Sequence, residues 1–224
     1  MKSTLRMACL LIISCLSVSQ PVFAADKKIG ILVFDGVLTS DITAPLEVFG
    51  VASRQTWFSD YTPVVIAVKD TDSITTEEGL TLNTDSWIGA NPEVDVLIVP
   101  SSYDMEPLLD DPKLISYIRH TARSAEWMAS NCSGSFLLGE AGLLDGKKAT
   151  TWAGGEADLQ DSYPKVDVQF DSNVVVDGRV ITSNGSLVSY QAALILLSKL
   201  TSQAKAEEVA ETIQYSRFSD KVYF

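Results

Sequence analysis

Residues 130–135, with the sequence Ser-Asn-Cys-Ser-Gly-Ser, constrain the fold of this chain more than any other stretch. A short apolar run at 126–129 precedes them, and residues 136–144 follow with apolar side chains at helical spacing. Strand, sharp turn and helix, in that order, are typical of a nucleophile elbow, which holds a reactive side chain in a strained turn. The pattern therefore makes Cys132 the first candidate for chemistry.

Two interpretations of Cys132 remain open on this pattern alone. The helix after the turn would direct its N-terminal amides and dipole at the sulfur, which favours the thiolate over the thiol. Alternatively, cysteine is among the most often buried residue types, and Cys132 would then be an inert core side chain. The first interpretation predicts an activated thiol.

Residues 1–24 have the features of a secretory signal peptide. Two cations supply the positive N-terminal region, and residues 7–16 form an apolar core that is too short to anchor a chain across a bilayer. Ala24 ends a small-x-small pattern, so cleavage is expected after it. A second interpretation is a lipoprotein signal, in which Cys15 becomes lipidated. We favour the first because the folded domain begins just after Ala24, and we expect a periplasmic or secreted protein with no membrane span.

Export would leave Cys132 as the single cysteine, because Cys9 and Cys15 lie within the signal. An unpaired thiol is a liability in an oxidising compartment, so its presence gives some support for a role.

Removing the two cations of the signal from 17 Lys and Arg residues leaves 15 against 29 acids, a net charge of −14. Such a surface repels phosphate backbones, and the sequence shows no helix-turn-helix pattern. A nucleic-acid partner is therefore not expected.

Apolar runs alternate with helical patterns along the rest of the chain. Residues 28–34 and 94–100 are continuous apolar runs, typical of strands buried on both faces of a parallel sheet. Further strands are expected at 62–68, 147–151, 166–170 and 173–181, a hairpin or extended pair at 75–82, and helices at 42–53, 155–160, 187–200, 204–215 and from Asp111-Pro112 onward. This alternation predicts an α/β fold in which helices sandwich a doubly wound, mainly parallel sheet.

Ligands of such sheets bind at the carboxyl ends of the strands, an edge that would gather Asp41, Ser101, Ser102 and Cys132. Asp41 has a purely structural alternative as the N-cap of the helix expected from residue 42. The single histidine, His120, falls opposite the apolar face of its helix and is expected on the surface.

Several motifs in order resemble the ThiJ/PfpI family, within the class I glutamine amidotransferase-like superfamily. They are residues 29–36, 40–49, 96–100, 132–138, 140–146 with 149–151, and 177–183. The resemblance implies a flavodoxin-like fold for a domain at 28–200, with 201–224 as its C-terminal helix and tail. The pattern is closest to isonitrile hydratase-like members, and to domains of transcription regulators whose added DNA-binding domain is not expected here. The resemblance also implies a homodimer.

Isonitrile hydratase-like members use an elbow cysteine, an aspartate and a hydroxyl residue, which Cys132, Asp41 and Ser133 match. Threonine is more usual than serine at the last position. The resemblance implies that these three residues are catalytic and that neither a metal nor a cofactor is needed.

Two positions depart from the family pattern. Ser101 and Ser102 stand where Gly-Gly commonly follows the strand, and a backbone oxyanion hole there would lack the tightest glycine conformations. Trp152 stands where hydrolase-like members often have histidine, so a Cys-His pair is missing. We expect Ser101, Ser102 and Trp152 to take part in binding, with a core position as the alternative for Trp152.

Three hypotheses for function follow. In the first, the protein hydrates or hydrolyses a small electrophile, with Cys132 as nucleophile, Asp41 as proton shuttle, and amides of Ser133 and near Ser101 holding negative charge. In the second, it is a non-catalytic periplasmic binder of small ligands or a cysteine redox sensor. In the third, the thiol is only part of the core. The pattern does not name the substrate, and we favour the first hypothesis.

Overall fold

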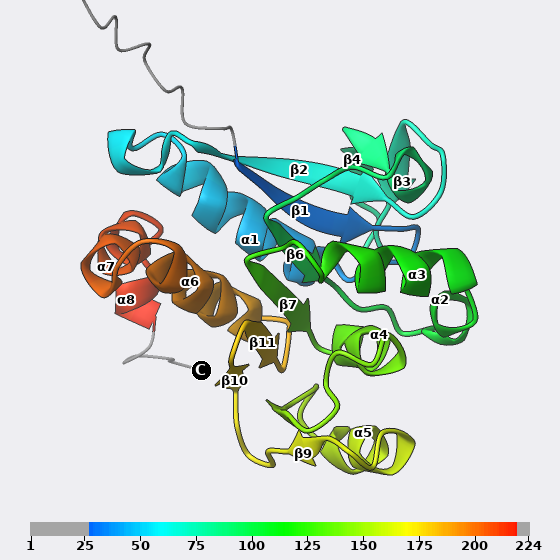
Figure 1. The fold of residues 1–224 in the computed structure, drawn as a ribbon. Coiled ribbons are helices and arrows are strands. Elements are labelled where there is room, and N and C mark those ends of the chain that lie inside the picture. The colour runs from blue at the N-terminus through cyan, green and yellow to red at the C-terminus, as the bar shows by residue number, and fades with distance from the viewer. Residues whose placement is uncertain (1–26, 219–224) are drawn as a thin grey trace, which may run out of the picture.

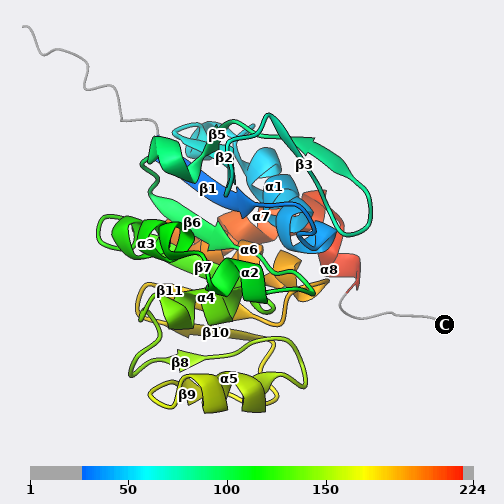
Figure 2. The same cartoon turned by 90° about the vertical axis from the view of Figure 1, so that its right-hand side faces the viewer.

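The computed structural model describes residues 27–218, so the expectations for Ala24 and Cys15 lie outside it. Its centre is a seven-stranded sheet in the order β10–β11–β7–β6–β1–β2–β5 (Figure 2). All neighbours pair in parallel except β10 and β11. These strands are β1 (Lys27–Val33), β2 (Tyr61–Ala67), β5 (Ser86–Trp87), β6 (Val96–Val99), β7 (Trp127–Asn131), β10 (Val174–Asp177) and β11 (Val180–Ser183). The mainly parallel sheet is confirmed.

Helices cover both faces of this sheet. Figure 1 shows α1 (Thr39–Ala52), α6 (Val188–Leu200) and α7 (Gln203–Thr212) on one face, and α3 (Pro112–Thr121) and α4 (Gly134–Glu140) on the other. Shorter elements complete the layers: α2 (Glu106–Leu109), α5 (Glu156–Ser162), α8 (Tyr215–Phe218) and the 3-10 turns Thr56–Phe58 and Ile88–Ala90. The doubly wound sandwich is therefore also confirmed.

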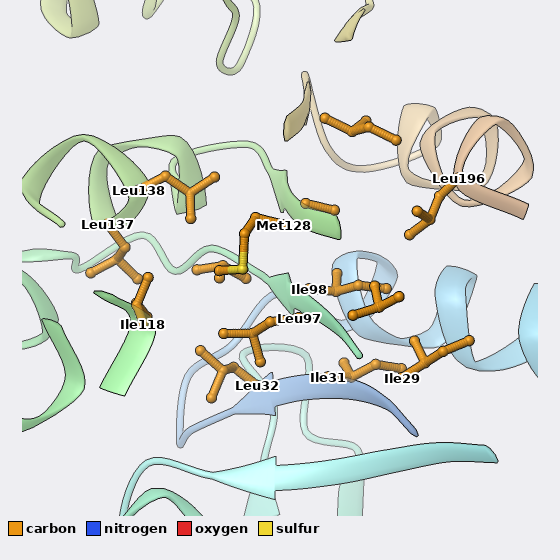
Figure 3. Packing of buried hydrophobic residues seen from close by; sticks show 14 of the residues in the cluster. Ile29, Ile31, Leu32, Leu97, Ile98, Ile118, Met128, Leu137, Leu138 and Leu196 are labelled. Atoms are coloured by element: carbon orange, nitrogen blue, oxygen red, sulfur yellow. The ribbon is translucent and has the colours of Figure 1, made fainter. Parts of the chain in front are cut away.

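The apolar core lies on both sides of the central strands. Ile31 and Leu32 follow each other in β1 and point to opposite faces, and both are fully buried (Figure 3). Leu137 and Leu138 of α4 pack on one side of the sheet, and Leu196 of α6 packs on the other. Burial on both faces is the reason that β1 reads as a continuous apolar run.

Two small two-stranded sheets extend the fold. The expected hairpin is present as β3 (Ser73–Thr75) and β4 (Thr81–Asn83), which pair in antiparallel fashion. β8 (Lys148–Ala149) pairs in parallel with β9 (Asp167–Val168) below the edge strand β10 (Figure 2). Within residues 27–218, no helix is both long and apolar enough to cross a membrane.

The start of α1 differs from the expectation. The helix begins at Thr39 rather than at residue 42, and its N-cap is Leu38, which makes no side-chain capping bond. Asp41 is therefore the third residue of the helix, and the interpretation of Asp41 as an N-cap was wrong. Its side chain points into the protein, where it is fully buried.

Candidate active site

Cys132 lies in the sharp turn that joins β7 to α4. Its φ angle of 51° is in the left-handed region, which costs a non-glycine residue roughly 1–2 kcal/mol. The turn is fixed from both sides of the residue. The Cys132 amide donates to the carbonyl of Ser183 at 2.9 Å, and the Cys132 carbonyl accepts from Thr151 Oγ1 at 3.0 Å and Ser135 Oγ at 3.1 Å. The surrounding bonds therefore stabilise a strained backbone, as expected for an elbow.

Gly134 allows the elbow to pack directly against the end of β6. A Cβ atom at this position would lie 2.3 Å from the carbonyl oxygen of Val99 and 2.8 Å from that of Pro100, which is too close for any side chain. Ser133 Oγ donates to the carbonyl of Ser102, two residues beyond Pro100, at 3.2 Å. These contacts set the loop after β6 beside the cysteine.

Asp41 is held behind the elbow by serine side chains and amides. Its Oδ1 accepts from the amide of Ser186 and from Ser189 Oγ, both at 2.9 Å. Its Oδ2 accepts from Ser101 Oγ at 2.5 Å, and the Ser101 amide also donates to the carboxyl group. Three serines from two separate segments of the chain thus fix the orientation of one buried carboxyl.

The backbone of Asp41 is fixed as well, through a consequence of Pro45. Proline has no N–H, so Pro45 cannot donate to the carbonyl of Asp41 four residues earlier in α1. Asn131 Nδ2 donates to that carbonyl instead, at 2.9 Å. Because Asn131 immediately precedes Cys132, this bond ties the aspartate directly to the elbow.

Gly185 shows how closely Asp41 and Cys132 approach. A Cβ atom at Gly185 would lie 2.4 Å from Cys132 Cβ and 2.9 Å from Asp41 Oδ1. Gly185 has a φ angle of 77°, a conformation that glycine adopts without strain. Asp41 Oδ1 and Cys132 Cβ therefore both lie next to Gly185, and the absence of a side chain there makes room for them.

Burial sets the protonation of this pair. It raises the pKa of Asp41, although the bonds from Ser101, Ser186 and Ser189 act in the opposite direction. Burial and the neighbouring Asp41 carboxylate also raise the pKa of the Cys132 thiol, against bonds from Ser101 and Ser133 that lower it. The expectation of a thiol with a lowered pKa is therefore wrong, because burial and the neighbouring carboxylate outweigh the bonds that lower the pKa.

The half-buried Cys132 opens into a cavity of about 600 Å³. Its wall is mostly apolar and aromatic, with serines and one carboxylate at other points: Leu38, Ser40, Glu78, Ser102, Tyr103, Met105, Leu109, Ser133, Phe136, Trp152, Asn184 and Ser186. The structure thus brings Ser102, Ser133 and Trp152 together around Cys132. Such a cavity suits a small, largely apolar molecule.

Ser101 does not take the position expected for a binding residue. It is fully buried, lies outside the wall of the cavity, and turns both its amide and its hydroxyl toward Asp41. The Ser102 amide donates to Met105 Sδ at 3.3 Å. The amide expected near Ser101 for an oxyanion is therefore engaged elsewhere, because the loop folds back to satisfy the buried carboxyl.

His120 does not line this cavity. It is exposed at the end of α3 and lines a different hollow together with Trp87 and Lys113. Within residues 27–218, no group of three or more His, Cys, Asp or Glu side chains could hold a metal ion.

Residues 27–199 match the model of the DJ-1/PfpI family. The chain belongs to this family. The isonitrile hydratase of Pseudomonas putida is 33% identical over 190 residues, which cover 84% of this chain and 78% of the relative. A deglycase of Pyrococcus horikoshii is 31% identical over 123 residues, 54% of this chain and 72% of the relative. A ThiJ/PfpI family protein from Pseudomonas syringae has a similar fold, with a TM-score of 0.76 at 24% identity over 96% of this chain and 84% of that one.

In this DJ-1/PfpI chain, sequence reasoning missed the segment that closes the site from the β11 side. Asn184 lines the cavity, Gly185 packs between the two reactive groups, and Ser186 and Ser189 bind the carboxyl. One signal was present: an Asn-Gly pair directly follows an apolar strand, at the carboxyl edge of the sheet.

Proposed function

We propose that this protein is a cysteine-dependent hydratase of small isonitriles. One observation carries the proposal: Cys132, held in a strained elbow, opens into an apolar cavity while a buried carboxyl lies directly behind it. The similarity to an isonitrile hydratase over 84% of the chain supports the same reaction.

The chemistry of isonitriles suits a pair of groups with raised pKa values. The terminal carbon of R–N≡C accepts a proton and a nucleophile at the same atom, so the site must supply both. Asp41 and Cys132 repel each other when both are ionised, so the pair resists the loss of its last proton. That proton would move to the carbon as Cys132 Sγ forms the C–S bond, giving the thioformimidate R–N=CH–S–Cys.

Water then completes the reaction. Its oxygen adds to the same carbon, one of its protons goes to the nitrogen, and the C–S bond breaks. The formamide R–NH–CHO leaves, and the second proton of water returns to the Asp41–Cys132 pair. This reaction needs no strong base. Trp152 in the wall of the cavity could not supply one, because its indole N–H is only a donor.

The test is direct conversion. The purified protein, incubated with phenyl isonitrile or cyclohexyl isonitrile, should form the matching N-formyl amine, which is detected by liquid chromatography and mass spectrometry. Cys132→Ser should abolish the reaction because it removes the nucleophile. Asp41→Asn should slow the reaction by at least tenfold because it removes the group that holds the proton for the carbon. Absence of formamide with every isonitrile tried would refute the proposal.

Redox sensing by Cys132 is the weaker candidate. A thiolate is the form that peroxides oxidise, and burial together with Asp41 raises the pKa of this thiol. Peroxide treatment followed by intact mass should therefore show oxidation of Cys132 no faster than that of free cysteine.

We further propose that the mature protein begins after Ala24, is exported, and forms a homodimer. The N-terminal sequence supports export, and the family resemblance supports pairing. Cell fractionation, N-terminal sequencing and light scattering test these points. Retention in the membrane through Cys15, or a monomer at micromolar concentration, would contradict them.

A further inference from the structure

Asp41 has no direct access to a molecule in the cavity. Its carboxyl is fully buried and is absent from the cavity wall, which Cys132 reaches. A proton held on Asp41 must therefore pass through another group before it can reach a molecule in the cavity. Ser101 is the residue in position to do so, and this role deepens the proposed hydration.

We propose that Ser101 Oγ relays a proton between Asp41 and Cys132. The hydroxyl lies 2.5 Å from Asp41 Oδ2, and Ser101 is itself fully buried. Gly134 packs on the carbonyls of Val99 and Pro100, the two residues that precede Ser101, so the chain enters this loop beside the elbow. A hydroxyl has one proton and two lone pairs, so it can donate to one neighbour while it accepts from the other.

The relay has two states that hold the same protons and differ only in which group, the thiol or the carboxyl, is protonated. With Asp41 ionised, Ser101 donates to the carboxylate and accepts from the thiol. When the thiol gives its proton to Oγ and Oγ gives its own to Oδ2, Asp41 becomes neutral, and Ser101 then donates to the thiolate. Serine is neutral in both states, so one proton has moved from sulfur to carboxyl, and the reverse transfer returns it.

Other groups around the cavity do not offer this path. The remaining titratable side chains of its wall are Glu78 and Tyr103, and Thr39 holds the Glu78 carboxylate through its amide at 3.0 Å and its hydroxyl at 2.5 Å. Ser186 reaches Asp41 through its amide, and Ser189 reaches it from α6 at Oδ1. Ser101 Oγ is the group that binds Oδ2, and Ser101 also acts to lower the pKa of the Cys132 thiol.

The experiment follows the titration of the thiol in the full-length protein. The rate of alkylation of Cys132 by iodoacetamide is measured by intact mass from pH 6 to pH 11. Ser101→Ala removes the hydroxyl and should raise the apparent pKa of Cys132 by about one unit, because a hydrogen bond that stabilises the thiolate is lost. Below that pKa, alkylation should then be about tenfold slower. Ser101→Thr restores a hydroxyl and should recover most of the parent profile.

Ser130→Ala is the matched control. Ser130 is another fully buried serine, two residues before Cys132, and among the described residues its Oγ has no hydrogen-bond partner. This variant should alkylate with the parent profile. If Ser101→Ala does not fold, Ser101→Gly removes the same hydroxyl and should show the same rise. An unchanged profile in the folded Ser101 variant, or an equal shift in Ser130→Ala, would overturn the relay.

This titration needs no substrate, so its outcome is separate from that of the hydration. A shifted profile in a protein that forms no formamide would support the relay and refute the hydratase. Formamide production by a protein whose profile does not depend on Ser101 would do the reverse.

Discussion

The indole of Trp152 stacks on the ring of Phe136, with centroids 5.4 Å apart and planes inclined by 25°. Phe136 in turn meets Tyr163 edge to face, at 6.0 Å and 72°. Trp152 and Phe136 both line the cavity that contains Cys132. The position that would hold a histidine in hydrolase-like relatives is therefore part of an aromatic wall.

Loss of this wall should weaken the binding of aromatic substrates. Trp152→Ala should raise KM for phenyl isonitrile about three- to tenfold, because one stacked aromatic contact contributes about 0.5–1.5 kcal/mol. KM for methyl isonitrile should change much less. Trp87→Ala is the matched control, since Trp87 is half-buried in the wall of a different hollow and should leave both constants unchanged. Equal effects on both substrates would contradict the assignment.

The parent protein should have negligible esterase and protease activity. Indole cannot accept a proton from sulfur, and the raised pKa of Cys132 keeps the thiolate scarce at neutral pH. Hydrolysis of a chromogenic acetate ester measures this, with Trp152→His as the variant that places a base in the cavity and should gain activity. Fast ester hydrolysis by the parent, lost in Cys132→Ser, would contradict this account.

The sequence predicted the centre of the sheet well, because β1 and β6 are buried on both faces and read as apolar runs. It predicted the start of α1 less well, since Thr39 and Ser40 resemble a loop, and Leu38 gives no capping signal. β5 is only two residues long and has no pattern of its own.

The candidate site was predictable where a single residue marks a sharp turn, as at Cys132. It was not predictable where tertiary packing decides the direction of a side chain. Ser101 could have faced the cavity, but the buried Asp41 carboxyl needs donors and takes both its amide and its hydroxyl. The direction of the Cys132 pKa likewise depends on burial, which no local pattern reports.

Gly185 should tolerate no side chain. Gly185→Ala would place a methyl group 2.4 Å from Cys132 Cβ at a φ angle of 77°, so it combines backbone strain with overpacking. We expect a loss of about 2–5 kcal/mol of unfolding free energy. Gly142→Ala is the control, because its φ is 73° and nothing lies within 4 Å of the added atom, so it should lose only about 1–2 kcal/mol. Equal losses in urea unfolding would show that the close packing is not tight.

The thiol should make stability fall at alkaline pH. The pKa of Cys132 is raised in the folded state, so the folded protein keeps a proton that the unfolded chain loses above about pH 8.5. Stability is therefore fully present below that pH and declines as the pH rises toward the folded pKa, by up to about 1.4 kcal/mol per unit. Cys132→Ser does not titrate there, so its thermal midpoint should fall less between pH 8 and pH 10. Parallel curves for parent and variant would contradict the raised pKa.

The central claim is that Cys132 adds to an isonitrile carbon and that water releases a formamide. The most direct measurement uses phenyl isonitrile in water enriched in ¹⁸O, with the product followed by mass spectrometry. The account predicts N-phenylformamide that carries one ¹⁸O atom, an enzyme mass increased by one isonitrile during turnover, and neither signal with Cys132→Ser. Formation of the same formamide at the parent rate by Cys132→Ser, or no formamide from the parent, would contradict it.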